Sequence, residues 1–239
     1  MPEEINRIVT DRLADLLFTH SEDAVENLRR EGAADESIHF VGNTMIDSLV
    51  AVEERFRNAG VASQLGLRPG GFVLVTLHRP ALVDGPLLKQ AIAQLGVVGR
   101  ELPVVFPVHP RTRARLAGAM PAGIRLLEPL GYVDFLSLEA DAAAVLTDSG
   151  GVQEETTYLG VPCFTLRDTT ERPVTVDVGT NRLLGLDPSR IADMLDALSG
   201  SLPRRERPPL WDGAAAIRIA DVITDEKTWS LLNAPSRGT

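Results

Sequence analysis

The segment from residue 143 to residue 155 reads AAVLTDSGGVQEE, and it decides the fold. Its first five residues, AAVLT, are apolar up to the final threonine, which is typical of a strand buried on both faces of a parallel sheet. Gly150 and Gly151 then allow a tight turn into a helix that we predict from residue 152 to residue 159. The free N–H groups at the start of such a helix can point at an anion such as a diphosphate, and Ser149 adds a hydroxyl donor.

Two acidic residues follow the glycines, since Glu154 and Glu155 lie in the first turns of this predicted helix. We expect one to complement the positive end of the helix dipole and the other to accept a hydrogen bond from a sugar hydroxyl. The spacing is equally compatible with an ordinary strand-to-helix turn, in which Ser149 is the N-cap and the glycines only close the backbone. Both interpretations stay open at this point.

Strand-like and helix-like segments alternate around this stretch. The predicted strands are 72–77, 103–108, 124–127, 143–147 and 162–166. The predicted helices are 86–98, 111–119, 133–140, 152–159 and 189–198. The alternation predicts an α/β fold with a doubly wound parallel sheet, whose ligands bind beyond the carboxyl ends of the strands.

That edge of the sheet is where the histidines fall. His78 follows the first of these strands and His109 the second, so both are expected to face the same crevice as Ser149. Because Arg79 is adjacent, we expect the imidazole of His78 to be biased toward its neutral form and to act as a base or bind a phosphoryl oxygen. Each histidine could equally be a hydrogen-bonded residue at a strand end. Arg172, in the loop after the last strand, could bind an anion or simply belong to a capped loop.

The two ends of the chain read differently from the middle. A helix over 3–12, a strand over 16–19 and a helix over 22–31 are predicted first, and a last helix over 213–223 follows a proline-rich break. A single strand needs a sheet to join, so we expect apolar surface to be exposed here, above all at Leu16, Leu17 and Phe18. Glu3 opens the first helix, where a carboxylate complements the helix dipole, and nothing in its local sequence marks it as catalytic.

Composition excludes several classes of protein. The chain has 239 residues and a net charge of −9, with no basic block that could follow a nucleic acid. No run approaches the roughly 18 apolar residues of a membrane span. The single cysteine, Cys163, and the lack of a signal-peptide pattern favour a reducing cytoplasm. Without metal-ligand spacing or a dinucleotide-binding motif, we expect no metal and no cofactor.

Seven motifs, taken together, resemble the non-hydrolysing UDP-N-acetylglucosamine 2-epimerases. They are MPEEINR at 1–7, GNT at 42–44 with Asp47, TLHRP at 76–80, PVHP at 107–110, DSGGVQEE at 148–155, RDTTERP at 167–173 and WDGA at 211–214. Each motif alone is weak, but their order and spacing match the family along nearly the whole chain. The family's pattern starts more than a hundred residues ahead of residue 1, so this chain resembles its C-terminal part.

The resemblance implies a glycosyltransferase-B-type fold of two Rossmann-like domains. Residues 1–40 would then be a remnant of the N-terminal domain, 41–210 the UDP-binding domain, and 211–239 a crossover helix and tail. The implied reaction interconverts UDP-N-acetylglucosamine and UDP-N-acetylmannosamine by elimination of UDP and its re-addition, without a redox cofactor. The partner would be the UDP-sugar together with a missing N-terminal domain or a separate chain, and a homodimer stays open.

The resemblance also assigns roles to residues. Glu3 and His78 match catalytic positions, and the nucleotide would be held by Ser149, Gly150, Gly151, Glu155 and Phe135. Further contacts to the substrate or to an anion would come from Arg79, His109 and Arg172. The chain departs from the family pattern at two places. Residues 80–84 read PALVD where many members have another arginine and then Glu-Asn, which bears on the activation of the family by substrate at a second site. Val174 stands where a glutamate is common, which bears on a polar contact near the nucleotide.

Two other functions remain. One is a UDP-binding module, or a subunit of a split enzyme without activity of its own. The other is a UDP-sugar glycosyltransferase of the same fold, which the set of Glu3, His78 and 149–155 matches less closely.

Overall fold

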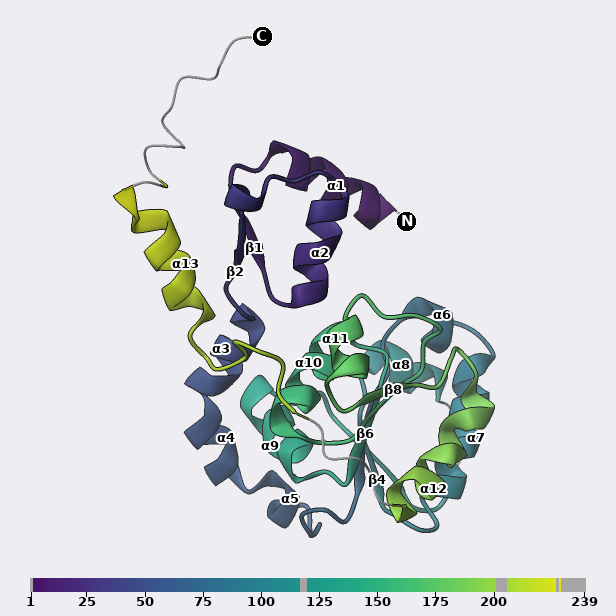
Figure 1. Ribbon diagram of the computed structural model, residues 1–239. Coiled ribbons are helices and arrows are strands. Elements are labelled where there is room, and N and C mark those ends of the chain that lie inside the picture. Colours follow the sequence, from purple (N-terminus) through teal and green to yellow (C-terminus); the bar gives the residue numbers. More distant parts are fainter. Residues whose placement is uncertain (1, 117–119, 201–205, 227, 229–239) are drawn as a thin grey trace. The chain divides into compact units, whose positions relative to one another are not determined.

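The computed structural model describes residues 2–116, 120–200, 206–226 and 228 (Figure 1). The chain divides into two compact units, Met1–Ala51 with Pro208–Thr239, and Val52–Arg207. Among the described residues, no helix has the length and apolar character needed to cross a membrane.

The second unit contains one six-stranded sheet and the helices that cover it. Its strands are β3 Val73–Thr76, β4 Val104–Pro107, β5 Ile124–Leu127, β6 Ala144–Thr147, β7 Cys163–Thr165 and β8 Asn181–Leu183. Its helices are α4 Glu53–Ala59, α5 Val61–Gln64, α6 Pro80–Val83, α7 Leu87–Val98, α8 Pro110–Arg115, α9 Tyr132–Asp141, α10 Gly150–Leu159, α11 Pro173–Asp177, η2 Pro188–Ala192 and α12 Asp193–Ser199.

All pairings in this sheet are parallel, and the strand order is β5-β4-β3-β6-β7-β8. The chain therefore builds outward from β3 on one side and then returns to build outward from β6 on the other. The strand order reverses between β3 and β6, which is where open α/β sheets bind ligands. The predicted α/β fold with a doubly wound parallel sheet is confirmed. Strand β8 was not predicted, because NRL is short and polar.

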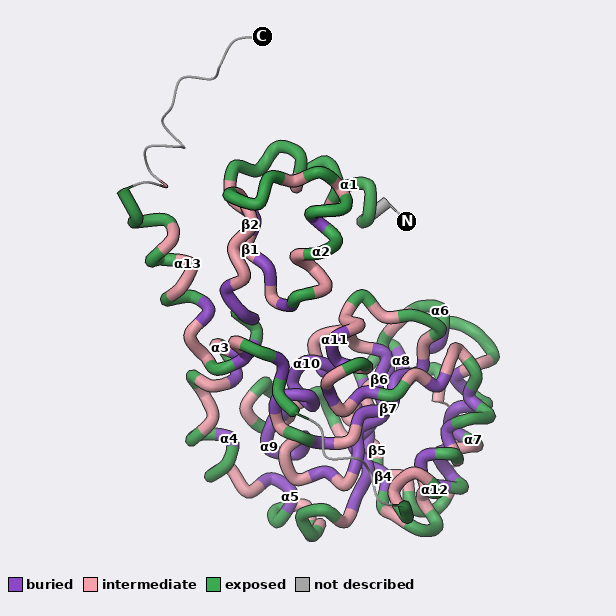
Figure 2. The backbone as a smooth tube through the Cα atoms, in the orientation of Figure 1, coloured by how far each residue is buried: buried purple, intermediate pink, exposed green. Residues whose placement is uncertain are grey.

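The strands are apolar because both of their faces are covered (Figure 2). In β3, Val73 and Val75 join a hydrophobic cluster with α7 and η2, whereas Leu74 joins a second cluster with α5 and α9. In β6, Leu146 and Val145 divide between the same two clusters. Burial on both faces removes the polar alternation that a half-exposed strand would show. The two clusters fix β3 and β6 side by side, and so fix the ends of both strands.

The first unit contains a small parallel pair of strands. Its elements are α1 Pro2–Leu13, β1 Leu17–Thr19, α2 Glu22–Arg30, η1 Asp35–Ser37, β2 Ile38–Phe40, α3 Thr44–Ala51 and α13 Ala215–Thr224. β1 pairs with β2 in register Leu17 to Ile38. The strand predicted from the sequence is therefore not alone, because residues 38–40, for which no strand was predicted, supply its partner.

The last helix is tied to this unit by hydrogen bonds. Both carboxylate oxygens of Asp47 accept N–H groups at the start of α13, from Ala215 at 3.1 Å and Ala216 at 2.6 Å. The indole of Trp211 is buried and donates to the carbonyl of His20 at 2.8 Å. Gly42 has a φ of +91°, and a Cβ there would lie 2.1 Å from the carbonyl oxygen of Leu210, so only glycine fits. These contacts give physical roles to the GNT and WDGA motifs.

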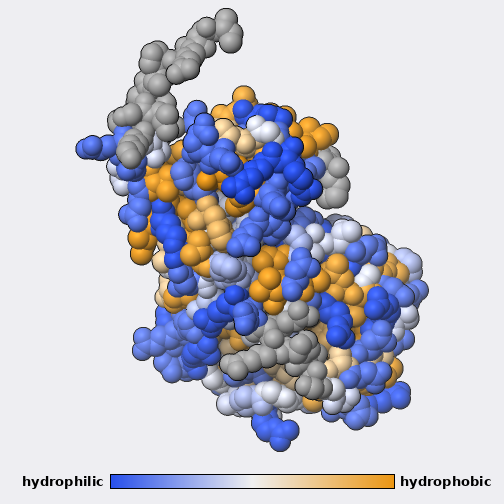
Figure 3. Space-filling model, viewed as in Figure 1, coloured by the Kyte–Doolittle hydropathy of each residue, from blue (hydrophilic) through white to orange (hydrophobic). Residues whose placement is uncertain are grey.

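The first unit exposes apolar side chains, as predicted, but at other positions. Leu17 is buried in β1, and Leu16 and Phe18 are half-buried. The exposed large apolar side chains lie mainly on α1 and α13, at Ile5, Ile8, Val9, Leu13, Ile217 and Ile223, and Met45 on α3 is exposed as well. Figure 3 shows apolar surface over the first unit, in the region of α1. The prediction for 16–18 was wrong because the pairing with β2 and the cover of α2 bury that strand.

Candidate functional site

The site is built on the ends of β3 and β6, the two strands between which the strand order reverses. Asp148 follows β6 and is 1% exposed. Its carboxylate accepts the backbone N–H of His78 at 3.0 Å and that of Arg79 at 2.8 Å, and its Oδ1 lies 2.8 Å from Nδ1 of His78. Arg79 Nε donates to the backbone carbonyl of Asp148 at 3.0 Å. One buried carboxylate thus joins the two strand ends and orients the imidazole.

This geometry corrects the expected protonation of His78. The hydrogen bond to Asp148 raises the pKa of the imidazole above its ordinary value, and it outweighs the opposing effects of burial and Arg79. The expectation of a neutral bias considered only the adjacent arginine. The pKa of His78 is determined mainly by the carboxylate of Asp148, which is 70 positions away in sequence and adjacent in the sheet. A positive imidazole with its Nδ1 held by Asp148 presents Nε2 as a donor, which suits an anionic ligand.

The start of α10 lies beside this pair. Ser149 is its N-cap residue in extended conformation, and it makes no capping hydrogen bond with its side chain in the described part of the chain. The Ser149 N–H instead donates to Thr147 Oγ1 at 3.0 Å. Neither Gly150 nor Gly151 has a positive φ, so the turn itself does not require glycine, contrary to the sequence interpretation. A Cβ on Gly150 would meet nothing within 4 Å, so this glycine leaves open space over the helix N-terminus.

Glu155 is nearly buried on α10, at 5% exposed, and accepts a hydrogen bond from the hydroxyl of Tyr132 at 2.9 Å. Burial raises the pKa of Glu155 to about 7. Glu139 on α9 is fully buried, and burial and the charge of Glu155 raise its pKa well above the ordinary value. Phe135 is half-buried on α9 and packs against the second hydrophobic cluster. Glu155 and Phe135 therefore belong to neighbouring helices of the same unit.

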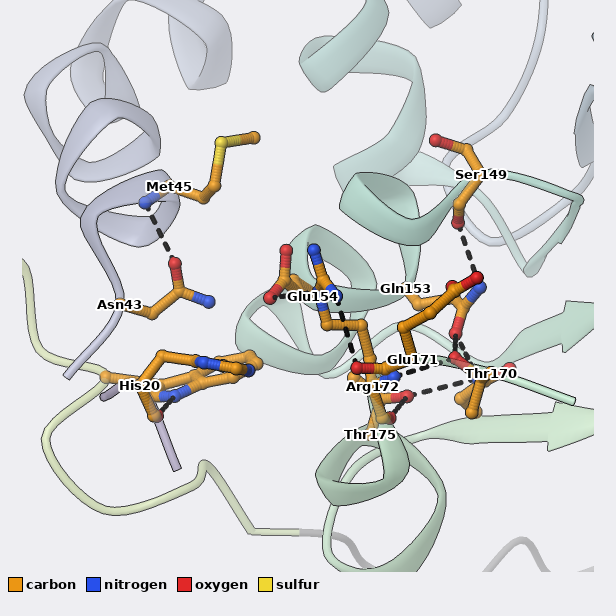
Figure 4. A network of polar contacts seen from close by, with 12 residues as sticks. His20, Asn43, Met45, Ser149, Gln153, Glu154, Thr170, Glu171, Arg172 and Thr175 are labelled. Atoms are coloured by element: carbon orange, nitrogen blue, oxygen red, sulfur yellow. Dashed lines mark hydrogen bonds and ion pairs between the residues drawn. The ribbon is translucent and has the colours of Figure 1, made fainter. Parts of the chain in front are cut away.

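Arg172 lies in the loop between β7 and α11 and reaches α10. Its Nε is 3.0 Å from Oε1 of Glu154, which is buried (Figure 4). Glu154 therefore pairs with an arginine. We expected one of the two glutamates to complement the helix dipole, but α10 begins at Gly150 and has no acidic residue in its first turn. Nearby, Arg167 binds Glu171 through two hydrogen bonds of 2.8 Å and 2.6 Å and lowers the pKa of that carboxyl to about 2.

His109 follows β4 at the same edge of the sheet, but its side chain has a structural contact. Nδ1 accepts the N–H of Arg111 at 3.3 Å, which caps α8. The guanidinium of Arg111 pairs with Asp84 at 2.8 Å. The interpretation of His109 as a hydrogen-bonded strand-end residue fits this geometry, while its assignment as a ligand contact stays a prediction.

Glu3 lies in α1, in the first unit, whereas every contact above lies within the second unit. Sequence reasoning did not single out Tyr132 and Glu139. No motif marks them, because their partner Glu155 comes from the next helix and is 23 positions from Tyr132. A tyrosine opening one helix and a glutamate inside it would become a signal only once α9 and α10 are known to pack together.

The family is shown by comparison with known proteins. The family model described as UDP-N-acetylglucosamine 2-epimerase matches residues 1–224. The chain belongs to the UDP-N-acetylglucosamine 2-epimerase family. A relative of that name from Methanococcus maripaludis is 36% identical over 241 residues, covering 95% of this chain and 65% of the relative. A Pseudomonas aeruginosa relative, UDP-2,3-diacetamido-2,3-dideoxy-D-glucuronate 2-epimerase, is also 36% identical, over 93% of this chain and 63% of its own length.

Known structures agree with this assignment. The Methanocaldococcus jannaschii UDP-GlcNAc 2-epimerase in complex with UDP-GlcNAc and UDP matches with a TM-score of 0.77 and 36% identity, over 94% of this chain and 65% of that one. The S. aureus protein MnaA with UDP matches with a TM-score of 0.82 and 28% identity, over 100% of this chain and 67% of that one. The chain spans about two thirds of the length of these relatives, and its fold is that of the C-terminal part of a glycosyltransferase-B-type structure.

Proposed function

We propose that this chain is the UDP-binding part of a UDP-N-acetylglucosamine 2-epimerase, which interconverts UDP-GlcNAc and UDP-ManNAc. The observation that supports this most is the uncapped start of α10 beside the His78–Asp148 pair, in a chain that belongs to this family over residues 1–224. Helix N-termini with open N–H groups bind phosphates. Ser149, Gly150 and Gly151 would hold the diphosphate, Glu155 the ribose hydroxyls, and Phe135 would lie near the uracil.

In the proposed reaction, the proton on C2 of the sugar is removed and the bond from C1 to the diphosphate oxygen breaks, leaving a glycal and UDP. UDP then adds back to C1 as a proton returns to the opposite face of C2. When protonated, His78 beside the start of α10 would stabilise the charge that develops on the departing diphosphate. Arg79 and Arg172 supply further positive charge, although each already contacts Asp148 or Glu154.

Glu3 is proposed as a catalytic carboxylate, together with groups of an N-terminal domain supplied by the same polypeptide or by a separate chain. In this proposal residues 1–40 belong with that domain, 41–210 bind UDP, and 211–239 cross back. The grouping of residues 1–51 with 208–239 supports an association of the two ends of the chain. We place this reaction in the cytoplasm, which is the compartment that the sequence predicts. A second copy of the chain remains a proposed partner.

The test measures UDP binding and epimerisation separately. The purified chain is expected to bind UDP and to form no UDP-ManNAc from UDP-GlcNAc when followed by NMR. Fusion of the N-terminal third of the Methanococcus maripaludis relative ahead of residue 1 should produce epimerisation, with exchange of the C2 proton for solvent deuterium, and His78→Ala in that fusion should abolish it. Epimerisation by the 239-residue chain alone would contradict its proposed incompleteness.

Transfer of the sugar to an added acceptor, without epimerisation, would instead favour the glycosyltransferase. If UDP binds but the fused protein has neither activity, a binding module remains.

A further inference from the structure

A buried network of hydrogen-bonded side-chain amides and hydroxyls lies beneath the start of α10. Gln153, on α10, is fully buried, and Asn181, on β8, is 4% exposed. Nδ2 of Asn181 donates to Oε1 of Gln153 at 3.0 Å, and Nε2 of Gln153 donates to the backbone carbonyl of Ser149 at 3.0 Å. Figure 4 shows Gln153 between Ser149 and Thr170. The function proposed above uses neither amide.

The carbonyl of Ser149 at one end of this hydrogen-bond network fixes the direction of every hydrogen bond between the amides. A backbone carbonyl can only accept, so the NH₂ group of Gln153 must face Ser149 and its oxygen must face Asn181. The NH₂ group of Asn181 must then face Gln153, and it also donates to Thr175 Oγ1 at 3.1 Å. The remaining oxygen of Asn181 accepts from Thr165 Oγ1 at 2.6 Å. Turning over either amide would set like atoms against each other.

The same Gln153 oxygen also orders the loop that carries Arg172. It accepts the hydroxyl of Thr170 at 2.6 Å, and the oxygen of Thr170 accepts the N–H of Arg172 at 3.0 Å. Thr175 donates its hydroxyl to the carbonyl of Arg172 at 2.7 Å. The backbone of Arg172 is therefore held on both sides by hydroxyls that bind the two amides.

We propose that Gln153 and Asn181 are positioning residues for the diphosphate site, which set the Ser149 peptide at the start of α10 and the backbone of Arg172 together. This inference rests on the proposed function, because it takes UDP as the ligand. Neither amide needs to touch the ligand. They affect binding through the positions of Ser149 and Arg172. A substitution of Asn181 on β8 therefore shifts both of these residues of the proposed diphosphate site at once.

The test uses Asn181→Asp, which keeps the shape of the side chain and removes its donors. The new carboxylate oxygen faces the Gln153 oxygen, and the amide of Gln153 can escape only by turning its own oxygen toward the Ser149 carbonyl. The UDP dissociation constant is expected to rise about tenfold, as for loss of a hydrogen bond worth about 1.4 kcal/mol. The affinity for uridine, which has no diphosphate, should stay unchanged. Gln153→Met, which adds no charge, is the second variant in case the first does not fold.

Thr157→Val is the matched control. Thr157 is buried on the same helix, and its hydroxyl has no hydrogen-bond partner among the described residues. It should leave both affinities unchanged. Equal losses for UDP and uridine in Asn181→Asp and in Gln153→Met, or no loss for UDP in either, would overturn the proposal.

A ligand-free measurement separates this proposal from the proposed function. In ¹H–¹⁵N spectra of the chain, Asn181→Asp and Gln153→Met should shift the amide signals of Ser149 and Arg172 together and leave those of Val75 and Val105 in place. If UDP does not bind to the wild-type chain, the proposed function fails while this coupling can still be seen. If UDP binds and Ser149→Ala weakens it, but the two amide variants neither weaken it nor shift those signals, the positioning role fails alone.

Discussion

Two helices start at the same edge of the sheet, α8 after β4 and α10 after β6, and their N-termini are satisfied differently. At α8 the strand-end residue His109 turns its imidazole back to accept the N–H of Arg111. At α10 the strand-end residue Asp148 turns away to the neighbouring strand, and Ser149 makes no side-chain cap in the described part of the chain. The difference leaves the start of α10 without a side-chain cap among the described residues, as the proposed diphosphate site requires, whereas the start of α8 is capped by its own strand-end residue.

The largest effect is expected from a negative charge placed at the open end. Gly150→Glu should weaken UDP binding at least about 100-fold, because the new carboxylate competes with the diphosphate for the same N–H groups. The fold should be kept, since a Cβ on Gly150 meets nothing within 4 Å. Gly85→Glu makes the same charge change at another glycine with open space and should bind UDP normally. Isothermal titration measures both, and equal weakening in the two variants would show a general charge effect.

The next effect concerns the carboxylate that joins β3 and β6. Asp148→Asn should lower the free energy of unfolding by about 2–3 kcal/mol, because a buried charged acceptor of several N–H groups is lost. His78 has a raised pKa in the folded protein, so its pairing stabilises the fold fully below about pH 6.5 and less as the pH rises through the folded pKa. The difference in stability between wild type and variant should therefore shrink from about pH 5.5 to about pH 8.5. Urea unfolding at the two pH values checks this, and a difference that grows with pH would contradict it.

Glu155 provides a pH dependence of binding. Its pKa of about 7 means that its carboxylate is mostly protonated at pH 6 and mostly ionised at pH 8. Because the ionised carboxylate accepts hydrogen bonds from the ribose hydroxyls more strongly than the protonated carboxyl does, UDP affinity should rise up to about tenfold over this range. Glu155→Gln keeps the titrations of His78 and of UDP itself, so it serves as the control. A wild-type profile parallel to that of Glu155→Gln would exclude Glu155 from binding.

The smallest effect is expected at the capped helix. His109→Ala should lower the free energy of unfolding by about 1 kcal/mol through loss of the cap, and UDP affinity should change less than about twofold. Chemical unfolding and isothermal titration measure the two quantities. A large loss of affinity with little loss of stability would reverse the comparison and make His109 a ligand contact.

The sheet could be predicted well because its central strands are buried on both faces. Segments such as 72–77 and 143–147 are continuous apolar runs between turn residues, and the strands β3 and β6 lie within them. The short strands β2 and β8 were missed because IHF and NRL contain polar residues and have no such run. Their partners, β1 and β7, are distant enough in sequence that no local pattern indicates the pairing.

The local geometry of the candidate site could be predicted from the sequence only in part, because some of it depends on contacts between distant residues. The motif at 148–155 and its place after a strand could be read locally, since a helix start needs only neighbouring residues. The charge of His78 could not be read in this way, because it depends on Asp148 across the sheet. The raised pKa of Glu155 likewise depends on the burial that α9 provides, and the exposed apolar side chains on α1 could not be separated from those of β1 without the β1–β2 pairing.

The central claim is that the second unit holds a nucleoside diphosphate at the uncapped start of α10. The most direct measurement is isothermal titration of the purified chain with UDP, beside its Ser149→Ala and Gly150→Glu variants. The account predicts saturable binding by the wild type, weaker binding by Ser149→Ala and none by Gly150→Glu. Absence of wild-type binding at millimolar UDP, or binding that survives unchanged in Gly150→Glu, would contradict it.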